Sequence, residues 1–528
     1  MRGFLAELGQ DSFATFSPMS SLTTIRAIFA IAANKRLPVY HADVPNAFVQ
    51  SRIDTDIYVK LPTGTSFTDL DGHKYKHRRL PKLLKSLYGL RQSPLLFNKE
   101  IDSFFQTTLG YERGLSDSCL YTKTIHDSKT GTARFAIVSV NVDDIVITGD
   151  ADELIAEIKQ KLADTYNVQQ FEEVHTLLGF RVKRYSDGSY SLGVQAKIEE
   201  IFQEHPILLT KGKSNTPMSP SFKYREGEPT TEFELYIHEH FASLLGSLIY
   251  LSITCRPDLA QALGRCSRGM HQPTFQHVQM LGNMFRYLNA HRDLKLFYRS
   301  SENPINQYLR QTATKQADLT TIINYDDSQV AIGNFDPAVG FCDADYAPSN
   351  TERKSTTGYC FYLFGCLISW KSKLQPIVAT STHEAELIAL GICADEAVWL
   401  RKVLTELGFA INTQYNIRNP DNKNGVQYVQ DADGDPVDLL SEDDLFIRSI
   451  PILNDNLGST TTANNPETTN TRSKAIDVRW FKVREYIRSK EIRVHYIPNT
   501  WNVSDVMTKP ISNNFGTICT MLGLSRTL

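Results

Sequence analysis

The feature that most constrains this chain is a pair of adjacent aspartates, Asp143 and Asp144, set between two apolar runs. The runs, over 133–142 and 145–149, are rich in β-branched residues. Such runs predict strands, and the short connection between them predicts a β-hairpin with the aspartates at its bend. Aspartate is a common turn residue, and the dipeptide alone would favour that purely structural explanation.

A third aspartate, Asp43, shifts the balance towards a metal site. It lies near the end of another predicted strand, over 37–44. Three carboxylates brought together repel one another unless a cation binds between them, and hard divalent cations prefer such oxygen ligands. Two metal ions held in this way catalyse in-line phosphoryl transfer, which is the chemistry of nucleotide polymerisation.

The composition is that of a globular protein: 528 residues, 41% hydrophobic and 22% charged, enough for several domains with cores of their own. The first residues do not resemble a signal peptide, and the apolar run over 25–33 is too short to span a membrane. The eight cysteines include no C-x-x-C pair, so we expect buried, reduced thiols rather than a zinc or redox motif. We therefore expect a soluble, intracellular protein.

The net charge of −3 hides an uneven distribution. Residues 72–99 hold eight basic residues and no acidic one, whereas 419–445 hold eight acidic residues and one basic residue. An acidic insert thus masks a mildly basic body, and local patches matter more than the total. A solvated surface would also explain the basic run, but its lack of counter-charges makes an anionic partner the better interpretation.

The patterning predicts several regions of α+β structure. Residues 1–206 alternate short helical and strand patterns, and 207–298 carry helical spacing. Polar segments over 299–338 and 411–448 predict inserts or linkers, and a second α+β unit begins at Val339. The predicted helices include 23–34, 244–251, 278–289 and 382–407, and the predicted strands of the second unit include 340–343 and 358–364.

Five sequence blocks occur in a fixed order along the chain, and each alone is a weak signal. They span 41–64, 83–98, 140–150, 177–182 and 256–288, and they include "HADVPNAF", "SLYGLRQSP", "VNVDDIVITGD" and "RPDLAQAL". Together they closely resemble the reverse transcriptase of copia-type LTR retrotransposon Pol polyproteins. The resemblance covers almost the whole chain apart from the two inserts.

This resemblance implies a multidomain α+β fold, with a right-hand polymerase followed by a ribonuclease H-like domain. The opening segment over 1–18 resembles one that follows a further fingers region in the family, so we expect an N-terminally truncated polymerase with incomplete fingers. The implied domains are a palm with partial fingers over 1–206, a helical thumb or connection over 207–298, a linker over 299–338, and a ribonuclease H-like domain over 339–528.

The resemblance also implies roles for individual residues of the polymerase. Asp43, Asp143 and Asp144 match its catalytic, metal-binding aspartates. Phe48 matches the aromatic residue that closes off the sugar 2′ position, although a phenylalanine of the core would look the same in the sequence. The remaining nucleotide-binding residues implied by the resemblance are Gln92 and Val44.

One residue departs from the family pattern at the hairpin. The family usually has tyrosine or another aromatic residue where this chain has Asn141. That residue would pack near the primer end, so its replacement is expected to weaken primer placement without removing a metal ligand.

The C-terminal unit resembles the ribonuclease H domain that follows the polymerase in the same elements. By that resemblance Asp343, Glu386, Asp455 and Asp505 form a metal-binding tetrad that cuts the RNA strand of an RNA–DNA hybrid. Glu384 lies in the same helix start as Glu386, where compensation of the helix dipole is an ordinary explanation for it.

Two further segments of the C-terminal half bear on function. The family often has histidines in the segment matching 470–480, where this chain has Asn470 and Ala475. The basic stretch over 472–493 predicts a hybrid-binding face or, nearly as well, a solvated helix. The segment 431–442 matches the acidic positions of a calcium loop, but Pro436 replaces the glycine that the turn needs, so a solvated insert is the better interpretation.

The resemblance implies two Mg²⁺ ions per active site, with Mn²⁺ as an alternative. The implied partners are an RNA template, a DNA primer, an RNA–DNA hybrid and deoxynucleoside triphosphates, together with other Pol and Gag products but no membrane. A cytoplasmic virus-like particle is the expected location, with the nucleus as a second one. Three hypotheses remain: a bifunctional replicative enzyme, a degenerate copy that binds nucleic acid without polymerising, and a non-enzymatic binding protein adopted by the host.

Overall fold

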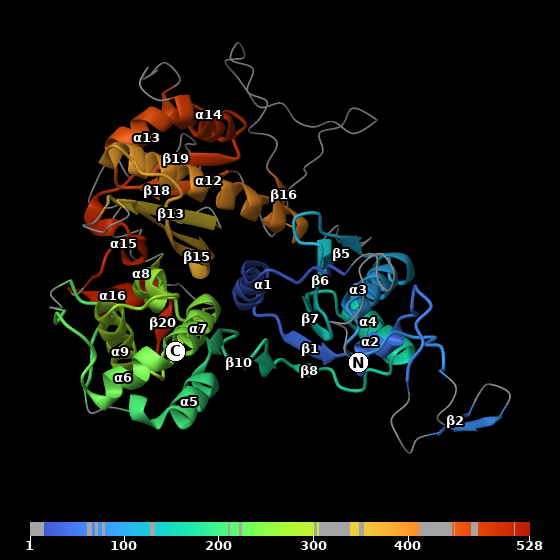
Figure 1. Ribbon diagram of the computed structural model, residues 1–528. Coiled ribbons are helices and arrows are strands. Elements are labelled where there is room, and N and C mark those ends of the chain that lie inside the picture. The colour runs from blue at the N-terminus through green and yellow to red at the C-terminus, as the bar shows by residue number, and fades with distance from the viewer. Residues whose placement is uncertain are drawn as a thin grey trace, which may run out of the picture. The chain divides into compact units, whose positions relative to one another are not determined.

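The computed structural model divides the chain into two compact units (Figure 1). Unit 1 comprises residues 1–21 and 38–174, and unit 2 comprises residues 22–37 and 175–528. The domain boundaries expected from the sequence differ from this division and stay a prediction. The described residues are 15–60, 66–68, 72–76, 80–126, 133–209, 212–220, 224–299, 304–305, 338–347, 353–408, 410–411, 446–447, 449–465, 474–511 and 513–527.

Unit 1 is built on a six-stranded antiparallel sheet with the order β4-β5-β6-β7-β1-β8. Its strands are β1 (Val39–Asp43), β4 (Glu112–Arg113), β5 (Leu120–His126), β6 (Ala133–Asn141), β7 (Asp144–Gly149) and β8 (Glu172–Glu173). The helices are α2 (Ala47–Gln50), α3 (Ser93–Ser103), which continues as a π-helix over Phe104–Thr108, and α4 (Asp152–Tyr166). A separate hairpin pairs β2 (Ser66–Thr68) with β3 (Lys74–Lys76).

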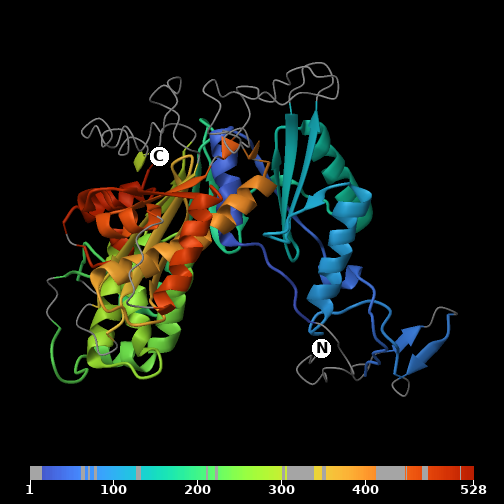
Figure 2. The same cartoon turned by 90° about the horizontal axis from the view of Figure 1, so that it is seen from above.

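The core of unit 1 lies on one face of this sheet. Alternate residues of β6 and β7, such as Val138, Val140 and Ile145, join one buried cluster with Phe97 of α3 and Ile158 of α4. Because side chains alternate between the two faces of a strand, the helices cover the face to which these residues point. Figure 2 shows helices along one face of the unit 1 sheet. The remaining residues of each strand point to the opposite face.

Unit 2 contains two five-stranded sheets. The first has the order β20-β12-β11-β10-β9, and the second has the order β15-β14-β13-β18-β19. The strands of the first are β9 (Thr176–Leu177), β10 (Phe180–Arg184), β11 (Tyr190–Gly193), β12 (Lys295–Tyr298) and β20 (Leu524–Ser525). The strands of the second are β13 (Ala338–Asp345), β14 (Thr356–Leu363), β15 (Cys366–Leu374), β18 (Ile450–Asn454) and β19 (Ile492–Tyr496).

The helices of unit 2 flank these sheets, and four of them overlap the predicted helices over 23–34, 244–251, 278–289 and 382–407. They are α1 (Leu22–Asn34), α5 (Gln195–Glu204), α6 (Glu232–Glu239), α7 (Phe241–Thr254), α8 (Ala260–Cys266), α9 (Phe275–Ala290), α12 (Thr382–Glu406), α13 (Leu457–Asn464), α14 (Lys474–Arg488), α15 (Asp505–Thr508) and α16 (Phe515–Met521). The short strands β16 (Ala410–Ile411) and β17 (Phe446–Ile447) form a separate parallel pair. None of the described helices is long and apolar enough to cross a membrane.

The predicted helical character of 207–298 is wrong at its end. Lys295–Tyr298 forms strand β12, which pairs with β11 on one side and with the C-terminal β20 on the other. A strand of four residues is too short to show the alternating pattern that would distinguish it from the preceding helix, and its partner strands are distant in sequence. The two predicted inserts and the calcium-loop segment over 431–442 lie almost wholly outside the described residues.

Helix α1 belongs to unit 2 although the sheet strand that follows it belongs to unit 1. Arg26 of α1 is buried, and its guanidinium lies 3.8 Å from the ring centre of Trp370. The same guanidinium donates to the carbonyl oxygens of Ile368 at 3.2 Å and Thr254 at 3.0 Å. These charge-assisted hydrogen bonds compensate the buried cation and fasten the helix to β15 and α7.

The cysteines are buried, as expected. All eight are free and buried. They act as small apolar side chains of the core.

Candidate active sites

Asp143 lies at the bend of the hairpin, as predicted, whereas Asp144 is the first residue of β7. Asn141 pairs with Asp144 across β6 and β7, which leaves Val142 and Asp143 as a two-residue loop. Val142 has a φ of 60°, and positive φ values are typical of the tight turns that join twisted antiparallel strands. The amide of Val44 donates to the carbonyl oxygen of Asp143 at 3.0 Å, so the end of β1 is tied to the bend.

The first carboxylate group comprises Asp43, Asp143 and Asp144. Asp43 on β1 pairs with Asp144 on β7, and both point to the sheet face opposite to the core helices. Partial burial, followed by the charges of Asp143 and Asp144, raises the pKa of Asp43. His41, two residues before Asp43 on the same face, places its Nε2 atom 2.7 Å from an oxygen of Asp144. The three carboxylates are therefore neighbours, but they are not among the groups whose oxygens all lie within 4.8 Å of one another.

The structure places the predicted nucleotide-binding residues around this group in different ways. The side chain of Val44 is buried in the core, so its backbone alone faces the bend. Phe48 packs against the edge of the core, with its ring centre 4.8 Å from that of Tyr88. Gln92 is buried at the start of α3, where its Nε2 atom donates to Thr55 Oγ1 at 3.3 Å. Their role in nucleotide binding stays a prediction.

Tyr88 was not singled out from the sequence, and its surroundings link Phe48 to the carboxylates. Partial burial raises its pKa, and the charges of Asp143 and Asp43 add to this effect. Its ring is half-exposed, with 47% of its surface accessible. An exposed aromatic ring beside carboxylates is a surface on which a sugar or base can rest.

Asn141 is the buried polar residue of the hairpin. It is 6% exposed, and its Oδ1 atom has no hydrogen-bond partner among the described residues. By strand alternation it lies on the same sheet face as Asp43 and Asp144. Asn141, the residue that departs from the family pattern, therefore places a buried amide oxygen next to the carboxylates.

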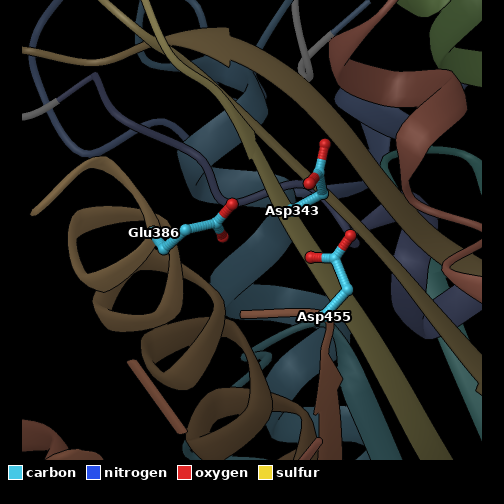
Figure 3. Close-up of side chains that lie close together, drawn as sticks. All are labelled: Asp343, Glu386 and Asp455. Carbon is cyan, nitrogen blue, oxygen red and sulfur yellow. The ribbon is translucent and has the colours of Figure 1, made fainter. Parts of the chain in front are cut away.

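The second carboxylate group comprises Asp343, Glu386, Asp455 and Asp505, and its first three members converge (Figure 3). Each of those three offers a carboxylate oxygen within 4.8 Å of the other two. Among the described residues this is the one such cluster of three or more potential metal ligands. Asp343 lies in β13, Glu386 in α12 and Asp455 directly after β18, so the packing of α12 on the sheet brings them together.

Burial and mutual repulsion raise the pKa values of carboxyl groups in the second carboxylate group. Burial, with Asp343 as the next contribution, raises the pKa of Glu386 to about 9. The same two causes raise the pKa of Asp505 to about 7 and raise that of Asp455. Such crowding disfavours the charged forms until a cation binds, which makes the donor set suitable for a hard divalent ion.

Hydrogen bonds hold carboxylates of the second group in place. Asn454 donates from Nδ2 to the Glu386 carboxylate at 3.1 Å, and Thr508 donates from its hydroxyl to Asp343. Asn502 donates from Nδ2 to the carbonyl oxygen of Cys342 at 2.8 Å, next to Asp343 in β13. Groups that orient metal ligands in this way commonly set the affinity of a site as strongly as the ligands do.

Lys509 is the charged residue of this site that the sequence did not reveal. Its ammonium lies 3.1 Å from Asp505 Oδ1 and 3.4 Å from Asp343 Oδ2. Burial opposes its charge, but Asp343 and Asp505 outweigh burial and raise the pKa of Lys509. The i, i+4 spacing from Asp505 at a helix start was the signal in the sequence that could have identified it.

Glu384 has the ordinary role expected of it. Ser381 caps α12 by accepting from the Glu384 amide at 3.1 Å, and the Glu384 carboxylate accepts from the Thr380 amide at 2.7 Å. Glu384 therefore fixes the helix start, and Glu386 one position beyond the first turn points to the cluster.

The predicted nucleic-acid-binding runs are described only in part. Within 72–99, Lys82 forms an ion pair with Asp56 at 2.5 Å, while Arg91 and Lys99 are exposed. Within 472–493, Arg484 donates to the carbonyl oxygen of Asn465 at 2.7 Å and is buried. That arginine stabilises the fold rather than offering a free positive charge.

The family follows from comparison with known proteins. Residues 1–220 match the family described as reverse transcriptase (RNA-dependent DNA polymerase). The chain is 29% identical over 524 residues to the retrovirus-related Pol polyprotein from transposon TNT 1-94 of Nicotiana tabacum, which covers 98% of the chain and 33% of that protein. The chain is similar to the Pol polyproteins of copia-type transposons over nearly its whole length. This similarity confirms the resemblance that the five sequence blocks predicted.

Two further comparisons extend this result. The chain is 28% identical over 526 residues to the Pol polyprotein from transposon RE1 of Arabidopsis thaliana, over 99% of the chain and 30% of that protein. The chain thus spans about a third of the length of these relatives. A solved structure of the foamy viral protease-reverse transcriptase dRH in complex with ds DNA shares 12% identity, covering 92% of this chain and 60% of its own, at a TM-score of 0.41.

Proposed function

We propose that this chain is an RNA-directed DNA polymerase and a ribonuclease that cuts the RNA strand of RNA–DNA hybrids. The observation that carries the proposal is the presence of two separate carboxylate groups, each assembled within a different compact unit of a chain from the reverse transcriptase family. One group serves strand extension and the other serves strand cleavage.

In the polymerase, Asp43, Asp143 and Asp144 would hold divalent ions, Mg²⁺ or Mn²⁺. Two such ions activate the primer 3′-hydroxyl and stabilise the leaving pyrophosphate. Phe48, packed against Tyr88, would exclude a 2′-hydroxyl and thereby select deoxynucleoside triphosphates. Gln92 and the backbone at Val44 would bound the nucleotide site beside the bend.

In the ribonuclease, Asp343, Glu386, Asp455 and Asp505 would hold two Mg²⁺ ions, which supply an activated water and stabilise the leaving oxygen. The clustering of three carboxylates and the raised pKa of Glu386 support this assignment. Asn454 and Thr508 keep Glu386 and Asp343 in place through their hydrogen bonds. The 2′-hydroxyls and the shape of the hybrid, rather than its base sequence, would be recognised.

A second candidate is a degenerate copy that retains the nuclease but no longer polymerises. Asn141 favours this candidate, because it occupies the position of an aromatic residue in the family and buries an oxygen that has no hydrogen-bond partner among the described residues. An RNA template, a DNA primer and an RNA–DNA hybrid are the partners in the first case, and the hybrid alone in the second. The proposed setting is a cytoplasmic particle formed with other transposon products.

One experiment separates these candidates. Purified protein in Mg²⁺ is given a primed RNA template with deoxynucleoside triphosphates and, separately, a labelled RNA–DNA hybrid. Extension and cleavage together support the bifunctional enzyme, and cleavage alone supports the degenerate copy. Folded protein with neither activity would refute both.

A further inference from the structure

Besides the second carboxylate group, unit 2 contains a cavity lined by polar and basic side chains. This cavity lies between helix α8 and the ends of strands β14 and β15. Its volume is about 290 Å³, and none of its lining residues belongs to the second carboxylate group. This volume is several times the roughly 30 Å³ that one water molecule occupies in the liquid, so the cavity can hold a group larger than water. Three basic residues line it, Arg265, Arg268 and Lys373, and no acidic residue does.

The charge of the cavity is only partly compensated. Arg265 donates to Asp345 Oδ2 at 3.1 Å, so a carboxylate balances its charge. Lys373 is exposed and has no ion-pair partner among the described residues. A surplus of positive charge in a concave site concentrates anions there.

Two buried polar side chains line the same cavity. Gln261 and Thr356 are each 5% exposed. The Nε2 atom of Gln261 and the hydroxyl of Thr356 have no hydrogen-bond partner within the described part of the chain. Because a buried donor without a partner costs free energy, these atoms indicate a ligand that accepts hydrogen bonds.

The wall of the cavity depends on a close approach of helix and strand. A Cβ atom added at Gly264 of α8 would lie 3.3 Å from the Ser372 hydroxyl oxygen of β15. The missing side chain at this position therefore lets α8 lie close to β15 beside the cavity.

We propose that this cavity binds a phosphoryl group. Arginine, lysine, amide and hydroxyl donors are the groups that bind phosphate oxygens, and the cavity combines all four. The phosphodiester backbone of a bound nucleic-acid strand is one source of this chemistry, and free inorganic phosphate is the other. The assignment to a backbone phosphate rests on the proposed function, whereas the phosphate chemistry does not.

The first test measures binding of a labelled RNA–DNA hybrid to the full chain in EDTA as a function of salt concentration. Lys373→Gln should weaken binding about threefold to tenfold and lower the slope of log K against log salt by about one. Lys371→Gln, on the same strand but outside the cavity lining, should keep the wild-type slope. Equal losses in the two variants would overturn the backbone assignment.

The second test uses inorganic phosphate alone. Phosphate should raise the thermal midpoint of the wild-type chain above that in chloride of the same ionic strength, and Lys373→Gln should abolish this rise. Gln261→Leu should fold normally, because its Nε2 atom has no hydrogen-bond partner in the described part of the chain, and should also abolish the rise. An undiminished phosphate effect in both variants would overturn the site.

These tests separate the inference from the proposed function. In one outcome, the wild-type chain neither binds nor cuts the hybrid, and phosphate stabilises the wild-type chain but not the Lys373→Gln variant. The cavity is then a free-phosphate site, and the proposed function fails. If the hybrid is cut and Lys373→Gln binds it with the wild-type affinity and slope, the backbone assignment fails and the proposed function stands.

Discussion

Asp43 and Asp144 are direct partners in the antiparallel register of β1 and β7. The two residues are 101 positions apart in the chain, and the sheet holds both on the face opposite to the core helices. Partial burial, followed by the charges of Asp143 and Asp144, raises the pKa of Asp43 and so disfavours its charged form. A strand pairing therefore carries the geometry on which the proposed polymerase depends.

The first prediction concerns His41, which lies 2.7 Å from Asp144. His41→Phe removes this contact and leaves the Asp144 carboxylate free to turn. We expect primer extension to fall roughly 10- to 100-fold, as is usual when a group that orients a metal ligand is lost. The control is Tyr40→Phe, a neighbouring change on the core-facing side of β1. Equal extension rates in His41→Phe and wild type would contradict this role.

The second prediction concerns the pH dependence of stability without divalent ions. The pKa of Glu386 is raised to about 9 and that of Asp505 to about 7, so both carboxyls hold protons in the folded state that the unfolded chain releases near pH 4–5. Their contribution to stability is fully present below that range and is lost as pH rises through the folded values. We expect the free energy of unfolding of the metal-free chain to decrease between pH 5 and 9, and Mg²⁺ to oppose the decrease.

Variants of helix α12 supply the check on this prediction. Glu386→Gln removes the largest of these shifts and should raise metal-free stability at pH 8 by about 1–3 kcal/mol, measured by urea unfolding. Glu384→Gln changes the same charge two residues earlier, where the carboxylate caps the helix, and leaves Glu386 and Asp505 in place, so the decrease in stability between pH 5 and 9 should remain. A pH profile of Glu386→Gln identical to wild type would contradict the assignment of the shift.

The third prediction concerns a buried ion pair in unit 2. Arg256 and Asp258 are 0% exposed in their side chains, 2.7 Å apart, and Tyr287 donates to the same Asp258 carboxylate at 2.7 Å. Asp258→Asn leaves the Arg256 charge buried without a counter-charge and should lower the free energy of unfolding by about 3–5 kcal/mol. Asp293→Asn, at an exposed pair with Arg526, should change it by no more than about 1 kcal/mol. Similar values for the two variants in urea unfolding would contradict the argument.

The local elements of both sites could be predicted from the sequence. β-Branched runs on either side of Asp143 and Asp144 determine a hairpin with a tight bend, because few other conformations bury both runs. The apolar spacing over 382–407 likewise predicts α12, and with it the helical position of Glu386. In both cases the decisive interactions are close in sequence.

What the sequence could not supply is contact between distant segments. Lys509 approaches Asp343 only because α15 packs near β13, and nothing in the local pattern of either segment specifies that distance. The strand character of Lys295–Tyr298 depends on pairing with β11 and β20. The assignment of α1 to unit 2 depends on the contact of Arg26 with Trp370, which are 344 residues apart.

The central claim is that the two carboxylate groups serve two separate reactions, and paired substitutions test it most directly. Asp143→Asn and Asp343→Asn proteins are each assayed for extension of a primed RNA template and for cleavage of an RNA–DNA hybrid in Mg²⁺. We predict that Asp143→Asn abolishes extension and leaves cleavage intact, and that Asp343→Asn does the reverse. Extension by Asp143→Asn at the wild-type rate, or loss of both activities in either folded variant, would contradict the claim.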